Sequence, residues 1–296
     1  MAMKKVANDK GYNRKMNKPR LSVITLTWNS KQYIDGMMGS VEKLNSVIPL
    51  ELIVADNGST DGSADSLKGF EKKSDFFMQV ILLPKNIGTT IPRNMAIRQA
   101  KGDYILIMDS DISFAPQGFT HMLDYLDASL QVGILAPKLC LESGSIQMSV
   151  KKFPTFNEKL NHTFGILFRT KLNSKDFYAV LEAATGPMEV ETAISAFWLF
   201  KRNLLDKVGY LDERIFYAPE DVDYCVRVWL AGLKVVYWPY FTAKHFTQQI
   251  SHHKPFNWVS ISHFLNMVCY FKKHRYFNDV ESLRMRIKTA VSNFRI

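Results

Sequence analysis

The chain has 296 residues, enough for one large domain or two small ones with a full hydrophobic core. Hydrophobic residues make up 47% and charged residues 22%, which is ordinary for a soluble globular protein. The net charge is +10, and residues 1–20 and 272–296 each hold seven Lys or Arg against at most two acids. Such basic ends suit an anionic membrane surface or an anionic substrate, or they are solvated tails without a partner.

Cys140, Cys225 and Cys269 are far apart and form no CxxC pair, which gives no support to a disulfide framework or a zinc site. A reducing compartment fits best. The N-terminus lacks the apolar core of a signal peptide, and no apolar run approaches the roughly 18 residues of a membrane span. We therefore expect a cytoplasmic protein, with association to the inner face of the cell membrane left open.

Residues 1–20 are polar and without periodicity, so we predict a flexible basic arm. From Leu21 onward, short apolar runs alternate with amphipathic stretches. The runs cover residues 21–27, 51–56, 78–83 and 103–109, and the stretches about 31–45, 63–73 and 90–100. Apolar strands with helical spacers predict a mostly parallel sheet covered by helices on both faces. The fold class is therefore α/β and doubly wound, with ligands at the carboxyl ends of the strands.

After about residue 140 the regular alternation fades. The sequence predicts a strand and loop at 145–155, a buried strand at 194–202, a helix at 220–232 and a strand at 233–239. The main domain is expected at residues 21–250, followed by a helical, basic and aromatic tail at 251–296. Its helix could lie on a membrane, pack on the domain or form a homo-oligomer.

The first four predicted strands each end in polar, turn-forming residues, which makes one rim of the sheet a candidate site. Polar loops alone would explain one such ending, but explain four at one edge less well. In "IMDSD", alternation along an extended chain places Asp109 and Asp111 on the same side. Two neighbouring carboxylates repel unless a cation lies between them, and their hard oxygens suit Mg²⁺ or Mn²⁺.

Two further loops contain binding candidates. Asp56, in "DNGSTDGS", could accept hydrogen bonds from a base or a ribose, or simply form an Asx-turn. Asn86 lies in a loop ahead of a helix whose first turns contain Arg93. A helix start with an arginine favours a diphosphate, although a surface salt bridge is the alternative.

"YAPEDVDYCVR" places Glu220, Asp221 and Asp223 at a helix start, where acids cap a helix or do chemistry. Asp223 is expected to be ordinary first-turn charge. His245 could be a surface histidine or a metal ligand. Trp198 could be a core residue or a platform for an acceptor sugar.

Taken together and in this order, five segments resemble a family 2 glycosyltransferase with the GT-A fold. They are "VITLTWNS", "IVADNGSTDGS", "NIGTTIPRNMAI", "AKGDYILIMDSD" and the stretch from "GYLDERIF" to "FTAKH". The later segments, including "SVKKFPT", are most similar to the rhamnosyltransferase-like branch that builds bacterial cell-surface polysaccharides. That branch often has Asn-Pro-Asp where this chain has Asp109-Ser110-Asp111, which leaves the donor sugar open.

The resemblance implies a role for each matching residue. It implies nucleotide-sugar binding by Thr25, Trp28, Asn29, Asp56, Asn86, Arg93 and Asp109. It implies a divalent cation, Mn²⁺ or Mg²⁺, held mainly by Asp111, with Asp109 and His245 as further ligands. Asp221 matches the catalytic base, and Glu220, its partner in the ED pair, is expected to orient the acceptor.

The expected function is an inverting glycosyltransferase that uses a UDP- or dTDP-sugar, with rhamnose as one candidate. Its acceptor would be a glycan or a polyprenyl-linked glycan in cell-surface polysaccharide synthesis, and no nucleic-acid partner is expected. One rival is a nucleotidyltransferase, but the loop "TWNSKQ" lacks the glycines and lysines that such an enzyme usually needs. The other rival, a non-catalytic glycan- or nucleic-acid-binding protein, would leave the acidic motifs unexplained.

Overall fold

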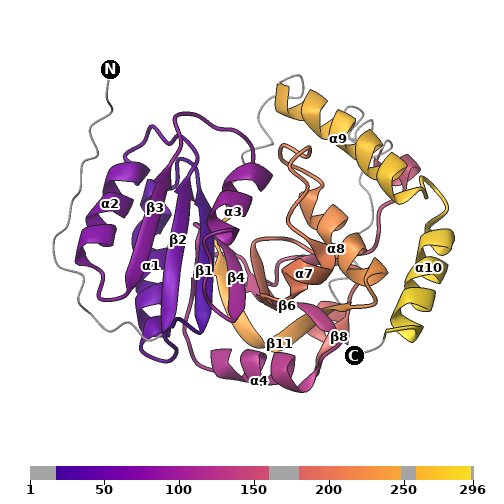
Figure 1. Cartoon of the computed structure of the whole chain (residues 1–296), viewed down its shortest axis with the longest axis horizontal. Coiled ribbons are helices and arrows are strands. Elements are labelled where there is room, and N and C mark those ends of the chain that lie inside the picture. The colour runs from indigo at the N-terminus through magenta and orange to yellow at the C-terminus, as the bar shows by residue number, and fades with distance from the viewer. Residues whose placement is uncertain (1–17, 160–179, 248–257, 295–296) are drawn as a thin grey trace.

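The structure is a computed structural model, and it describes residues 18–159, 180–247 and 258–294, with the side chains of 258–265 left out. The basic arm predicted at residues 1–20 therefore lies almost wholly outside the described residues. A nine-stranded sheet runs through the molecule, with helices on both of its faces (Figure 1).

The N-terminal half alternates strands and helices as expected. Its elements are β1 (Leu21–Thr27), α1 (Lys31–Asn45), β2 (Leu50–Asp56), α2 (Ser63–Lys73), β3 (Phe77–Leu82), α3 (Thr90–Ile97), β4 (Tyr104–Asp109), β5 (Ile112–Phe114) and α4 (Phe119–Ala128). Strands β3, β2, β1 and β4 lie side by side and are all parallel. Leu26 pairs with Asp109 and Thr27 with Asp56, so three strands end at one level.

The second half is more irregular. Its elements are β6 (Val132–Cys140), β7 (Val150–Lys151), β8 (Met188–Glu189), β9 (Thr192–Ala193), β10 (Phe197–Lys201), α7 (Leu204–Val208), α8 (Glu220–Leu230), β11 (Lys234–His245), α9 (Trp258–His274) and α10 (Val280–Ser292). Strand β10 lies between β4 and β6 and is antiparallel to both, so the sheet is mixed on this side. Only two residues of the segment predicted as a strand and loop at 145–155 pair as a strand, β7 with β9.

Two hydrophobic clusters cover the two faces of the sheet. One joins the sheet to α1, α2 and α4, and the other joins it to α3, α8, α9 and α10. Successive residues of β1 point to opposite clusters, Val23 to the first and Ile24 to the second. The expectation of a doubly wound α/β fold is confirmed.

The described part of the tail packs on the domain, which was one of its three predicted roles. Tyr270 and Phe271 of α9 and Leu283 of α10 are almost completely buried in the second cluster. Helices α9 and α10 run along the side of the molecule next to α8 (Figure 1). Of the tail aromatics, Phe256 and the side chains of Trp258 and Phe264 lie outside what the structure describes. Among the described residues, no helix is both long enough and apolar enough to cross a membrane.

Candidate functional site at the carboxyl edge of the sheet

A cavity of about 410 Å³ lies at the carboxyl ends of the strands. It is lined by residues that follow β1, β2, β3 and β4, by the start of α8 and by the end of β11. Its volume is within the range of sites that hold small ligands. It is lined by Trp28, Asn86, Arg93, Asp109, Asp111, Glu220, Asp221 and His245, all of which the sequence singled out.

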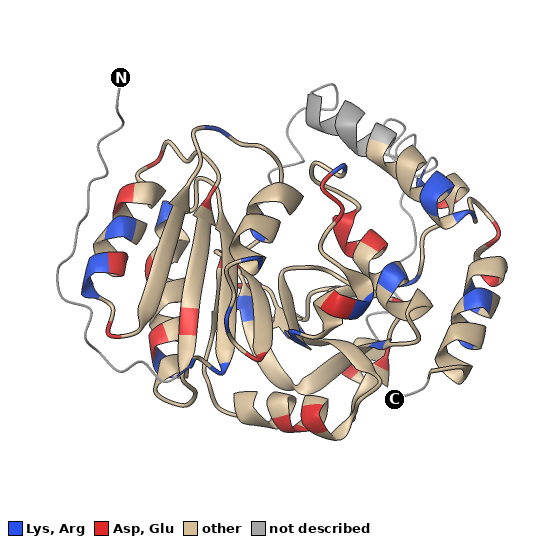
Figure 2. Cartoon of the chain, in the orientation of Figure 1, with Lys and Arg blue, Asp and Glu red and all other residues tan. Residues whose placement is uncertain are grey.

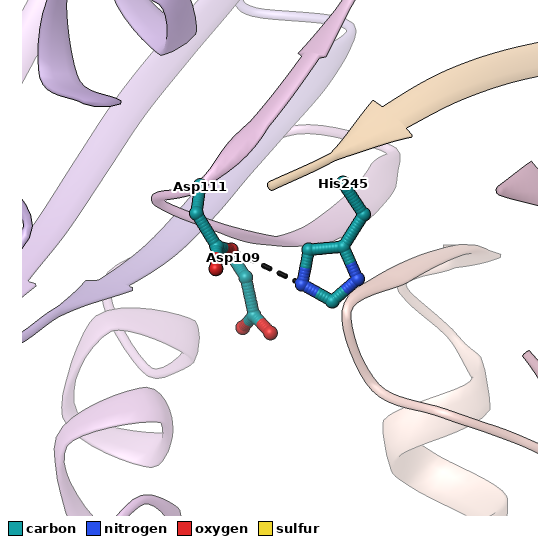
Figure 3. A group of neighbouring side chains, drawn as sticks. All are labelled: Asp109, Asp111 and His245. Carbon is teal, nitrogen blue, oxygen red and sulfur yellow. Dashed lines mark ion pairs between the residues drawn. The ribbon is translucent and has the colours of Figure 1, made fainter. Parts of the chain in front are cut away.

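The most distinctive group in this cavity consists of Asp109, Asp111 and His245 (Figure 3). One ligand atom from each of the three side chains lies within 4.8 Å of the others. Asp109 ends β4 and Asp111 follows two residues later. Strand β11 pairs with β5 so that His245 is opposite Ile112, and this register places the imidazole next to Asp111.

The imidazole of His245 has a partner on each ring nitrogen. Its Nε2 lies 3.2 Å from Asp111 Oδ1, and its Nδ1 lies 2.8 Å from Gln147 Oε1. Burial alone would lower the pKa of His245, but the hydrogen bond to Asp111 and the charges of Asp111 and Asp109 outweigh it, so the pKa is raised. If Nδ1 donates its proton to Gln147, Nε2 carries the lone pair that a metal ligand needs.

These three residues fit a divalent cation. Two carboxylates and one imidazole are ligands that Mn²⁺ accepts, and carboxylates suit Mg²⁺. The contact from Gln147 is the kind of outer hydrogen bond that orients a histidine ligand. Sequence reasoning missed Gln147, because its segment carries no motif and reaches His245 only through folding.

Arg93 connects the two acidic groups of the cavity. Its Nη2 lies 2.5 Å from Asp109 Oδ1, and its Nη1 donates to Glu220 Oε1 at 3.2 Å and to Ser195 Oγ at 2.8 Å. The guanidinium is almost completely buried, and the neighbouring carboxylates raise the pKa of Arg93 despite that burial. Arg93 lines the cavity, but these contacts are to protein acids, and Ser195 is a partner that the sequence did not indicate.

Glu220 and Asp221 are the first two residues of α8, where Figure 2 shows acidic residues. Burial, followed by the charge of Asp221, raises the pKa of Glu220 to about 8. Asp221 is half-buried, and its Oδ1 accepts the N–H of Val222 at 2.8 Å. Pro219 is the N-cap residue, so Asp221 caps a single backbone group next to itself and its side chain still lines the cavity.

The segment that leads to this acid pair is packed closely against the loop after β3. Thr89 donates its backbone N–H to Phe216 O at 2.6 Å, and Thr90 Oγ1 donates to Ile215 O at 2.7 Å. Gly88 has a φ of +91°, and a Cβ at this position would lie 2.2 Å from Phe216 O. Only glycine fits this contact, which brings the start of α3 next to the start of α8.

Three residues predicted at the nucleotide do not line the cavity themselves. Thr25 is buried within β1, and Asp56 is buried with its Oδ1 accepting the N–H of Ser59. Asn29 Oδ1 accepts the N–H of Thr60, so it joins the loops after β1 and β2. Asp56 Oδ2 is buried without a hydrogen-bond partner among the described residues.

Asn57 is a second residue that sequence reasoning missed. Its Nδ2 donates to Asn86 Oδ1 at 3.1 Å and to Gly88 O at 2.8 Å, and its Oδ1 accepts the N–H of Ile87. Asn57 therefore fixes the loop that contains Asn86. The turn "DNGS" was the available sequence signal for Asn57, but the prediction from this turn named only Asp56.

The role proposed for Trp198 at the acceptor is wrong. Its side chain is fully buried in β10, where it stacks on Tyr224 with ring centroids 5.7 Å apart. A ring without exposed surface cannot stack on a sugar. Strand β10 lies in the middle of the sheet, so its side chains are covered on both faces. Asp223, expected to be ordinary first-turn charge, is also fully buried and bound to α9.

Comparisons with known proteins find similarity to glycosyltransferases. The putative teichuronic acid biosynthesis glycosyltransferase TuaG of Bacillus subtilis (strain 168) is 36% identical over 110 residues, 37% of this chain and 42% of TuaG. The N-acetylglucosaminyl-diphospho-decaprenol L-rhamnosyltransferase of Mycobacterium tuberculosis (strain CDC 1551 / Oshkosh) is 24% identical over 247 residues, 79% of this chain and 76% of its own. The match to TuaG thus spans less than half of that relative.

Solved structures show the same fold. The mannosyltransferase PcManGT from Pyrobaculum calidifontis, in complex with GDP-Man and Mn²⁺, has a TM-score of 0.59 at 19% identity, over 87% of this chain and 64% of that one. TarS 1-349 of S. aureus in complex with UDP has a TM-score of 0.53 at 21% identity, over 77% of this chain and 61% of that one. The GT-A fold is confirmed. The model of glycosyl transferase family 2 matches residues 22–209, well over half of the chain, which therefore belongs to that family.

Proposed function

We propose that this protein is a metal-dependent, inverting glycosyltransferase of cell-surface polysaccharide synthesis. One observation carries the proposal: the group of Asp109, Asp111 and His245 lines the same cavity as Asp221. A cation site would bind the leaving diphosphate, and the carboxylate beside it would act as the base. The family supports glycosyl transfer as the reaction.

The metal group would hold Mn²⁺ or Mg²⁺ through Asp111, Asp109 and His245. When bound, the ion would neutralise charge that develops on the leaving diphosphate. Within the chain, Arg93 holds Asp109 in place through an ion pair, and Gln147 orients His245. The structures of PcManGT with Mn²⁺ and of GalNAc-T7 with UDP, GalNAc and Mn²⁺ support the choice of cation.

Asp221 would act as the general base. As the acceptor oxygen forms its bond to the anomeric carbon, the hydroxyl proton moves to the Asp221 carboxylate. The bond from that carbon to the diphosphate breaks, and its electron pair leaves with the nucleoside diphosphate. A single displacement inverts the configuration at the anomeric carbon. Glu220, held by Arg93, would orient the acceptor.

The donor would be a UDP- or dTDP-sugar, with rhamnose as one candidate. Trp28 and Asn86, which line the cavity, would contact the nucleotide, and Arg93, which also lines it, would lie near the diphosphate. Asn29, in the loop after β1, would support these contacts together with Thr25 of β1 and Asp56 of β2. The M. tuberculosis relative is named a rhamnosyltransferase, and TarS has been solved with UDP, which supports these candidates.

The acceptor would be a glycan on a phosphate-bearing carrier at a membrane surface. Burial, followed by the charge of Lys151, lowers the pKa of Lys159, whereas the charge of Asp221 raises it, so Lys159 lies within electrostatic range of Asp221. A lysine near the base suits an anionic acceptor. Two relatives are named for substrates that contain phosphate, a diphospho-decaprenol and a poly(ribitol-phosphate), and these names support this class of acceptor.

Thermal unfolding with nucleotides tests the proposal. A ligand that binds only the folded state raises the melting temperature by mass action. We expect UDP or dTDP to raise it by several degrees with Mn²⁺ and by much less without it. Asp111→Ala should remove the metal-dependent part. Folded wild-type protein that no nucleotide stabilises would contradict the proposal and favour the binding-protein rival.

A further inference from the structure

A cluster of buried charges lies behind the catalytic acid pair, on the side of α8 that faces the tail. Asp223 is completely buried, and its Oδ1 accepts from His274 Nε2 at 2.8 Å and from Lys273 Nζ at 2.7 Å. Its Oδ2 accepts from Arg227 Nε at 3.0 Å. Both Lys273 and His274 belong to the last turn of α9. A carboxylate buried with three cationic or polar partners is well satisfied and fixed in position.

Lys273 also holds the segment that precedes α8. Its Nζ lies 2.7 Å from Asp212 Oδ2 as well as 2.7 Å from Asp223 Oδ1. Asp212 lies just before the stretch whose backbone joins Thr89 and Thr90 at the start of α3. One ammonium group therefore connects the two ends of the segment 212–223, which contains Glu220 and Asp221.

The other side of the same segment is held by α3. Asn94 Nδ2 donates to Leu211 O at 2.9 Å, and Asn94 Oδ1 accepts the N–H of Leu211 at 3.1 Å. Arg93, its neighbour, contacts Glu220 directly. The acid pair is thus fixed between α3 on the cavity side and α9 behind.

Helix α10 completes this support. Arg286 Nη1 donates to the carbonyl of His274 at 2.7 Å, at the C-terminal end of α9, where free carbonyls need donors. Asp221 and Asp223 are two residues apart on α8, which rotates their side chains to roughly opposite sides of the helix. Contacts to Asp223 can therefore position Asp221 without occupying the cavity.

We infer that Lys273 and His274 are positioning residues for the catalytic base. Lys273 binds Asp212 and Asp223, His274 binds Asp223, and together they hold the first turn of α8 at the distance from the metal group that transfer requires. The inference rests on the proposed function of Asp221. It assigns the end of α9 a role in turnover, in addition to its packing in the core. Displacement of a base by about 1 Å can cost as much as 100-fold in rate.

Lys273→Ala is the sharpest variant, because the Lys273 side chain is 28% exposed and its removal leaves Asp223 bound to Arg227 and His274. Lys272→Ala is the matched control, since Lys272 is the adjacent, exposed lysine of the same helix. Lys273→Arg is the rescue variant. All are made in the full chain and compared by melting temperature, by hydrogen exchange of residues 212–223 and by turnover.

Turnover is measured as release of nucleoside diphosphate from whichever of dTDP-rhamnose, UDP-glucose and UDP-N-acetylglucosamine the wild type uses. We expect Lys273→Ala to lower kcat about 10- to 100-fold, with donor KM changed less than about twofold and the melting temperature within about 3 °C of wild type. Exchange at residues 212–223 should be faster. Lys273→Arg should recover most of the rate, and Lys272→Ala should match wild type.

Two results would overturn the inference: a kcat for Lys273→Ala within about twofold of wild type, or unchanged hydrogen exchange at residues 212–223. A loss of rate that Lys272→Ala shares would do so as well. An inactive but folded wild type would instead contradict the proposed function. In that case hydrogen exchange still decides whether Lys273 holds the first turn of α8.

Discussion

At the scale of single residues, the proposed chemistry depends on Asp221 more than on any other side chain. It is half-buried at the start of a helix, and its side chain lines the cavity. Burial, followed by the charge of Asp221, raises the pKa of the neighbouring Glu220 to about 8. A carboxyl group that keeps its proton near neutral pH can donate a hydrogen bond to an acceptor.

Asp221→Asn should abolish turnover while leaving donor binding intact. The amide cannot take the proton of the acceptor, and a positioned base typically contributes about 10²- to 10⁴-fold. We expect kcat to fall about 1,000-fold or more, with the nucleotide dissociation constant within about twofold of wild type. Asp65→Asn is the control, because Asp65 also lies in the first turn of a helix but is exposed and outside the cavity. If Asp221→Asn kept more than a tenth of the wild-type kcat, Asp221 would not be the general base.

At the scale of elements, the Asp223 cluster makes the junction of α8 and α9 sensitive to acid. Burial would raise the pKa of Asp223, but hydrogen bonds and charges from His274, Arg227 and Lys273 outweigh it, and the pKa lies below the ordinary 3.8. A lowered pKa in the folded state contributes stability that is complete above the unfolded value and is lost as pH falls through the folded value. The junction should therefore weaken below about pH 4.

Asp223→Asn should show this contribution directly. At pH 7 we expect the free energy of unfolding to fall by about 2–3 kcal/mol, because cations are left without their buried partner. The difference between Asp223→Asn and wild type should shrink as pH is lowered from about 5 to 3, as followed by denaturant unfolding. Asp35→Asn, at an exposed position of α1, should track wild type throughout. A difference that stays constant with pH would show that the Asp223 charge is not responsible.

The elements also show what the sequence could and could not predict. Strands β1, β2 and β4 could be predicted from the sequence because both of their faces are buried, which makes each a continuous apolar run. Strand β11 was expected to end at Pro239 but continues to His245, since its register with β6 is irregular between Trp238 and Thr242 and tolerates the proline there. The partners of the site, such as Gln147 and Ser195, come from distant segments without a local motif, so only folding reveals them.

At the scale of the whole molecule, the tail and the domain share one hydrophobic cluster. Val280, Leu283 and Ile287 of α10 are buried in the same cluster as Trp229 of α8 and Tyr237 of β11. The sequence suggested a separate tail because its composition changes near residue 250. Shared burial predicts instead that the tail unfolds together with the domain, in one cooperative transition.

Leu283→Ala tests that cooperativity. Leu283 is fully buried, so its truncation should lower the free energy of unfolding by about 3 kcal/mol. In a Trp258→Phe background, which leaves tryptophans only outside α9 and α10, tryptophan fluorescence should report the same midpoint as helical circular dichroism. Met285→Ala is the matched control on the same helix, because Met285 is 64% exposed and its loss should change stability by less than about 0.5 kcal/mol. If part of the helical signal melted first while the tryptophan signal stayed native, α9 and α10 would form an independent unit. The support that Lys273 and His274 give to the catalytic acids could then be lost without unfolding the sheet.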